Sequence, residues 1–226
     1  MNPIDVVIET GKKRTFASAL GWPGWSRSGK DEESALQALL DYGPRYARVL
    51  QNTDIEFQLP SDLSAFLVTE RLEGGAGTDF GAPEVPAEVE EKPLDSAELE
   101  RFKALLLACW QAFDRAVKQA TGKELRTGPR GGGRDLEKIM AHVIGADQAY
   151  LHRLAWKMEG TNEKNPEAEL QRTRQAILKA LESAVKEGLP EQGPRGGKIW
   201  PPRYFVRRVA WHVLDHTWKI EDRIIR

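Results

Sequence analysis

The second half of the chain has apolar residues at helical spacing in four successive stretches. In the first stretch, apolar residues recur every three or four positions between about 95 and 120. Comparable patterns run over about 134–159 and 166–186, and a fourth follows Pro201-Pro202. Four amphipathic helices in sequence predict an all-α four-helix bundle over residues 95–226.

The first 82 residues have a different pattern. Short runs containing β-branched or aromatic residues predict strands at 5–9, 14–20, 55–59 and 65–72, with a hairpin turn between the first two. Asp31, followed by Glu32 and Glu33, predicts the start of a helix that Gly43-Pro44 interrupts. The sequence therefore predicts a small α+β domain over 1–82, and an α+β fold class for the chain.

Residues 83–94, PEVPAEVEEKPL, are rich in proline and glutamate and contain no aromatic residue. This composition predicts a linker without regular structure that joins two separately packed units.

The stretch 14–40, RTFASALGWPGWSRSGKDEESALQALL, resembles the HicB-like fold. In that fold a strand, a Pro-Gly turn, a second strand and a glycine-containing step lead into a helix opened by acidic residues. The resemblance covers about Ile4 to Phe80. The DNA-binding tail found in many HicB antitoxins has no counterpart here.

Charge is divided unevenly along the chain. Residues 1–94 contain 9 Lys+Arg and 16 Asp+Glu, a net −7, whereas residues 95–226 contain 24 and 18, a net +6. This asymmetry predicts that the two parts attract each other, or that the helical part attracts small anions. Acidic residues are interspersed with the basic ones throughout the helical part, which argues against nucleic acid as a partner.

Cysteine and hydropathy patterns indicate the compartment. Cys109 is the only cysteine, which rules out an intrachain disulfide and favours a reducing cytoplasm. Its place in an apolar helical stripe predicts a packing role. No apolar run approaches the roughly 20 residues that span a bilayer, and the N-terminus has no secretory signal pattern, so no membrane association is expected.

Three of the four histidines fall on the apolar faces of predicted helices. His212 and His216 are four residues apart, which places both imidazoles on one helix face, and His142 faces inward on the second predicted helix. One such histidine is usually an ordinary core residue. Each buried imidazole without partners costs about 1–3 kcal/mol, and a shared divalent metal would satisfy three of them. His152 lies about 15 Å further along its helix than His142, so we do not expect it to belong to the metal site.

The sequences DLEKIMAHVIGADQAYL and RRVAWHVLDHTWKIEDR around these histidines resemble the two motif regions of the DinB/YfiT-like superfamily of four-helix metalloenzymes. The resemblance implies a divalent metal on His142, His212 and His216: zinc or nickel first, with iron or manganese as alternatives. It also implies a small-molecule substrate, a low-molecular-weight thiol as cosubstrate, thiol S-transfer or thiol-dependent isomerisation, and a homodimer. The alternative is a non-enzymatic sensor or binding module.

Two near-identical loops, GPRGGGR at 128–134 and GPRGGK at 193–198, precede the histidine-bearing helices. We expect Arg130 or Arg195 to bind an acidic substrate near the metal, although flexible solvated connections would have the same composition. Asp215, beside His216, is expected either to support a metal-ligating histidine or to form a surface ion pair.

Overall fold

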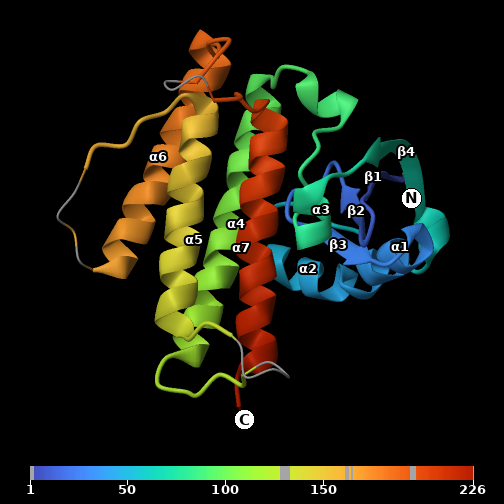
Figure 1. Ribbon diagram of the computed structural model, residues 1–226, viewed down its shortest axis with the longest axis horizontal. Coiled ribbons are helices and arrows are strands. Elements are labelled where there is room, and N and C mark those ends of the chain that lie inside the picture. The colour runs from blue at the N-terminus through green and yellow to red at the C-terminus, as the bar shows by residue number, and fades with distance from the viewer. Residues whose placement is uncertain (1–2, 128–132, 161–162, 164, 194–196, 226) are drawn as a thin grey trace.

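The computed structural model describes residues 3–127, 133–160, 163, 165–193 and 197–225. Its first part contains a four-stranded sheet of order β3-β2-β1-β4 (Figure 1). β1 pairs antiparallel with β2 and parallel with β4. The strands predicted at 5–9, 14–20 and 65–72 are thus confirmed, and the bounds of all four are β1 (Ile4–Thr10), β2 (Thr15–Ala19), β3 (Ser26–Gly29) and β4 (Phe66–Glu73).

Helices cover this sheet or flank it. α1 begins where predicted, because the Asp31 carboxylate accepts a hydrogen bond of 2.9 Å from the Ser34 backbone. The strand predicted at 55–59 is wrong: these residues have no regular structure, and Phe57 packs its ring against Trp22 and Trp25 instead. The α-helices of this part are α1 (Glu32–Asp41), α2 (Gly43–Leu50) and α3 (Ala76–Phe80).

Four long helices form the second part: α4 (Ser96–Ala120), α5 (Leu136–Leu151), α6 (Pro166–Glu187) and α7 (Pro202–Arg223). α5 is shorter than predicted and ends in a 3-10 turn over His152–Leu154. α4 and α7 run in the same direction, with α5 and α6 opposite to them (Figure 1). The Arg203–Glu98 ion pair at the starts of α4 and α7, and the Leu125–Ile224 bridge beyond their ends, fix this alignment.

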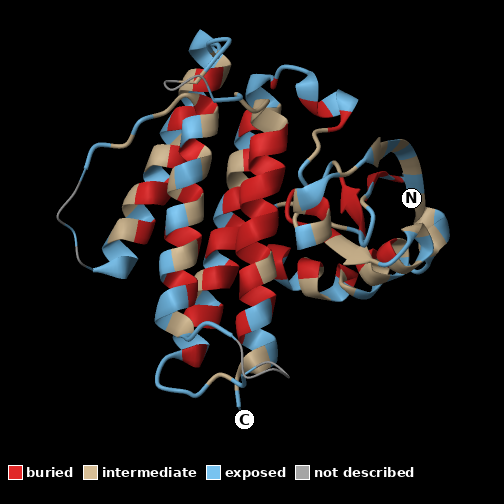
Figure 2. Ribbon diagram, viewed as in Figure 1, coloured by how far each residue is buried: buried red, intermediate tan, exposed pale blue. Residues whose placement is uncertain are grey.

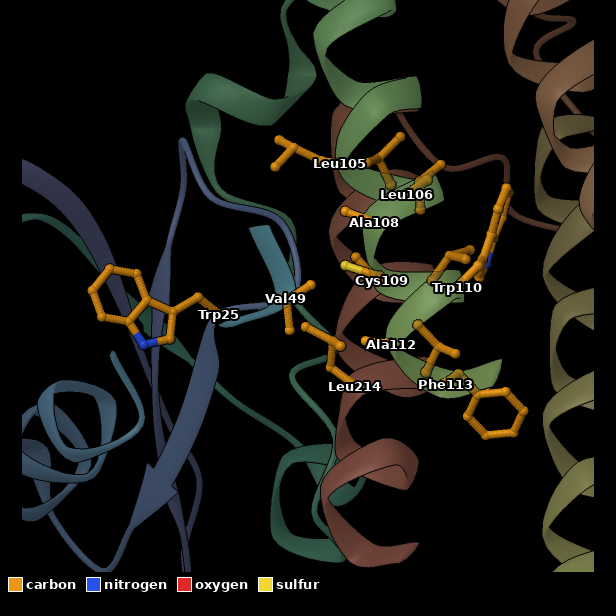
Figure 3. Packing of buried hydrophobic residues seen from close by; sticks show 14 of the residues in the cluster. Trp25, Val49, Leu105, Leu106, Ala108, Cys109, Trp110, Ala112, Phe113 and Leu214 are labelled. Atoms are coloured by element: carbon orange, nitrogen blue, oxygen red, sulfur yellow. The ribbon is translucent and has the colours of Figure 1, made fainter. Parts of the chain in front are cut away.

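The two parts share one hydrophobic core. α7 is buried along almost its whole length, because α4 and α5 pack on it within the helical part and the sheet domain covers a further face (Figure 2). Figure 3 shows Trp25 and Val49 of the first part in one cluster with Cys109 of α4 and Leu214 of α7. Cys109 is fully buried, as predicted, and burial raises the pKa of its thiol. The expectation of two separately packed units is therefore wrong.

A tight turn brings the sheet domain against α7. Gly24 lies between β2 and β3 with φ +95, a left-handed conformation that favours glycine. A Cβ at this position would lie 2.8 Å from Leu214 Cδ1 and 3.3 Å from Cys109 Sγ. Glycine is therefore required both by the backbone and by the close approach.

Residues 83–94 are packed against α7, contrary to the linker prediction. Glu88–Glu91 form a 3-10 helix, η2, and Glu90 is only 4% exposed. The Arg207 guanidinium of α7 donates to both Glu90 carboxylate oxygens, at 2.6 and 2.8 Å. Composition missed this packing because it depends on contacts with distant segments: the Arg207–Glu90 ion pair, and the Glu9 carboxylate, which accepts from the Glu84 and Val85 amides.

Ion pairs between the two parts have both polarities. Glu90 of the acidic first part pairs with Arg207 of the basic helical part, as the net charges predict. Elsewhere the first part contributes arginines and the helical part contributes acids: Arg27 pairs with Asp215 at 3.7 Å, and Arg45 pairs with Asp222 at 2.9 Å. Net charge alone therefore does not describe how the parts meet.

Among the described helices, none is both long enough and apolar enough to cross a lipid bilayer.

Candidate metal centre

The three predicted histidines meet between α5 and α7. His142 lies near the middle of α5, and His212 and His216 lie one turn apart on α7, which runs antiparallel to α5. His212 and His216 are 7% and 5% exposed, whereas His142 is half-buried. The cluster thus opens toward solvent on the His142 side.

Their ring nitrogens are close enough to bind one metal ion. The potential ligand atoms of the three rings all lie within 4.8 Å of one another. His142 Nε2 and His212 Nε2 are 3.2 Å apart. Two nitrogens bound tetrahedrally to one zinc at 2.0–2.1 Å would be about 3.4 Å apart. The observed separation therefore fits a shared ion with little adjustment.

The environment keeps these imidazoles neutral. Burial, followed by the neighbouring histidines, holds the pKa of His212 well below its ordinary value. Burial and Lys219 lower the pKa of His216 to about 4, although Asp215 opposes this shift. Burial, Arg134 and Lys219 also lower the pKa of His142. Neutral imidazole is the form that ligates metals, so the site is prepared for a cation.

A hydrogen bond between two imidazoles is the competing explanation of the 3.2 Å contact. It would satisfy one nitrogen on each of His142 and His212 and leave His216 without a partner. All three rings nevertheless approach edge to face, with centroids 4.7–5.1 Å apart. A shared metal ion would use a nitrogen of all three rings, whereas the two-ring hydrogen bond uses only His142 and His212.

Asp215 does not support a histidine. Its carboxylate pairs with Lys219 at 2.5 Å and with Arg27 at 3.7 Å. The buried Nδ1 atoms of His212 and His216 have no hydrogen-bond partner among the described residues. Of the two predictions for Asp215, the ion pair is therefore the one observed.

Sequence reasoning missed a second pair of polar residues beside the histidines. Arg208 lies one turn before His212 on α7, and its Nη2 donates to the Tyr150 hydroxyl of α5 at 3.2 Å. The Tyr150 ring lies 5.9 Å from the His212 ring, centroid to centroid. Four-residue spacing from His212 was the available signal for Arg208, since it places both side chains on one helix face.

Asp147 is a further buried acid on α5. It is fully buried, and neither carboxylate oxygen has a hydrogen-bond partner among the described residues. Burial raises its pKa to about 7, although Arg174 opposes the shift. Asp147 is therefore largely protonated in mildly acidic solution.

Arg130 and Arg195 lie outside the described residues. The residues flanking the first loop lie at the C-terminal end of α7, where Arg223 Nη1 donates to the Arg134 carbonyl at 2.9 Å. Those flanking the second lie beyond the C-terminal end of α5, where the Trp200 amide donates to the Arg153 carbonyl at 2.9 Å. Because α5 and α7 are antiparallel, these places are at opposite ends of the helical part.

Comparisons with protein-family models, with curated proteins and with solved structures gave no match.

Proposed function

We propose that this chain is a divalent-metal-binding protein whose helical part is a DinB-like four-helix bundle. The observation that carries the proposal is the convergence of His142, His212 and His216 within 4.8 Å. Zinc and nickel are the preferred metals, since three neutral imidazoles suit both ions. The resemblance of the two motif regions to DinB/YfiT-like proteins supports the same choice.

The proposed activity is thiol S-transfer, or thiol-dependent isomerisation, on a small molecule. When bound, the metal would supply Lewis-acid polarisation of a thiol or of a carbonyl oxygen. Three histidines leave a coordination position open, and the half-buried His142 lies on the side from which a small molecule could enter. The buried rings of His212 and His216 would exclude water from the opposite side.

The activity is tested with a thiol and an electrophile. Zinc-loaded and nickel-loaded protein would be assayed for consumption of glutathione or cysteine with a panel of small electrophiles. We expect turnover that EDTA abolishes and metal restores, and that the His212→Ala variant lacks. Stoichiometric metal binding without turnover on any pair would instead favour the non-enzymatic sensor.

A further inference from the structure

We propose that Tyr150 and Arg208 form an anion-binding subsite beside the three histidines, and that this subsite takes the carboxylate of a small molecule. The inference deepens the proposed function and rests on it in one respect: the remainder of the bound molecule would face the metal.

The first observation is an uncompensated buried charge. Arg208 is 7% exposed, and no described carboxylate forms an ion pair with it. The other two buried arginines differ, since Arg207 pairs with Glu90 and Arg174 pairs with Asp114. A buried cation without a counterion is costly. A bound anion would supply the missing charge.

The second observation is an excess of hydrogen-bond donors. A guanidinium has five N–H groups. In Arg208, Nη1 donates to the Pro83 carbonyl at 2.7 Å and Nη2 to the Tyr150 hydroxyl at 3.2 Å, whereas the buried Nε has no acceptor among the described residues. Since the Tyr150 oxygen accepts from Arg208, its own proton is directed elsewhere. The pair thus offers donors only, which suits a carboxylate.

Aromatic rings surround these donors. The Arg208 guanidinium carbon lies 5.0–5.8 Å from the ring centroids of Tyr150, Trp200 and Trp211. Such walls lower the local dielectric, which strengthens a charge-assisted hydrogen bond. Tyr150 and Trp200 are partly exposed, so the subsite borders solvent on their side. The ring of Tyr150 also contacts His212, which makes the subsite contiguous with the histidines.

The test measures binding of two carboxylate probes, benzoate and succinate, by calorimetry in metal-free and in zinc-loaded full-length protein. We expect at least one probe to bind, with Tyr150→Phe and Arg208→Lys each weakening it about tenfold or more. Tyr204→Phe is the matched control, because the Tyr204 ring packs against the same Trp200, at 5.0 Å, and its hydroxyl is not bonded to Arg208 in the described structure. This variant should bind like the wild type.

Three results would overturn the subsite. They are failure of both probes to bind the wild type, binding of inorganic phosphate or neutral benzamide as tightly as benzoate, and equal losses in Tyr204→Phe and Tyr150→Phe. Circular dichroism checks that each variant is folded. If Arg208→Lys does not fold, Tyr150→Phe still tests the subsite, because it removes only the hydroxyl. Zinc content, measured separately, tests the proposed function. If the chain binds a carboxylate but no zinc, the subsite stands and the proposed metal site is contradicted. If the chain binds zinc but no carboxylate, the metal site stands and the subsite is contradicted.

Discussion

Burial sets the protonation of individual side chains in the helical part. Burial is the largest cause of the lowered pKa of all three clustered histidines and of the raised pKa of Asp147. The same cause keeps a base neutral and an acid protonated, because in both cases it disfavours the charged form. Asp147 is the residue for which the effect on stability is simplest to measure.

Replacing Asp147 by Asn should remove a pH-dependent loss of stability. The ordinary pKa of 3.8 rises to about 7 in the folded chain. Between these values the folded state binds more protons than the unfolded state, so the free energy of unfolding of the wild type falls as pH rises from about 4 to 7. A difference of about three pH units corresponds to at most about 4 kcal/mol. Urea unfolding of both proteins at pH 4.5 and pH 8, in EDTA, measures it.

We expect the stability of Asp147→Asn relative to the wild type to increase from pH 4.5 to pH 8. Titration of the histidines is common to both proteins and cancels in this difference. A relative stability that does not change with pH would show that Asp147 ionises normally in the folded chain.

Sequence predicted the three histidines because their spacing alone places them on inward helix faces. It did not predict the Tyr150–Arg208 pair, since tyrosine fits an apolar stripe and a doubled arginine normally indicates solvent. The surroundings of both residues come from segments that are distant in the sequence. Arg208, for example, donates to the carbonyl of Pro83, which lies 125 positions away. Arg130 and Arg195 were proposed from a repeat, and their flanking residues lie at opposite ends of the helices.

At the scale of elements, α7 organises the molecule. It carries two of the three clustered histidines on one face and receives the sheet domain on another, where Phe16 of β2 meets Trp211 with ring centroids 6.1 Å apart. The helical spacing of apolar residues predicted α7, but not that every residue from Tyr204 to Leu214 is buried. The patterning did not reveal that η2 is fixed to α7, because one Arg207–Glu90 pair between distant segments has no local periodicity.

Glu90→Gln should destabilise the chain strongly. Arg207 and Glu90 are 2% and 4% exposed, so the substitution leaves a buried guanidinium without its counterion. Loss of one partner of a buried pair typically costs about 3–5 kcal/mol. Glu98→Gln is the control, because Glu98 also pairs with an arginine of α7, Arg203, but in a more exposed position. There we expect about 1 kcal/mol or less. Chemical denaturation measures both, and equal losses would contradict a special role for η2.

At the scale of the whole molecule, the sheet domain and the helices share one hydrophobic core. Their shared core includes Trp25, Leu214 and Cys109, and the few ion pairs between them lie around it. The sequence did predict the α+β class and the change from strand to helix patterning near residue 95. It predicted separate cores because the proline- and glutamate-rich composition of 83–94 is typical of a linker, and gives no sign that the two parts pack against each other.

Removing residues 1–94 should therefore destabilise the helices that remain. The fragment 95–226 would expose the face of α7 on which Leu214 and Trp218 lie, and which Gly24 and Tyr42 of the removed part now cover. We expect the full chain to unfold in one thermal transition, and the fragment to melt at least about 10 °C lower and to bind a hydrophobic dye. Two well-separated transitions in the full chain, with the later one matching the fragment, would contradict a single unit.

Metal stoichiometry tests the central claim most directly. Purified protein would be incubated with zinc or nickel, desalted, and analysed for metal per chain, with affinities from competition against a chromophoric chelator. We expect one ion per chain, with affinity at least tenfold weaker in His142→Ala, His212→Ala and His216→Ala, since each removes one ligand. His152→Ala, which removes the remaining histidine, should bind like the wild type. Absence of tight binding of either metal, or an equal loss in His152→Ala, would contradict the three-histidine site.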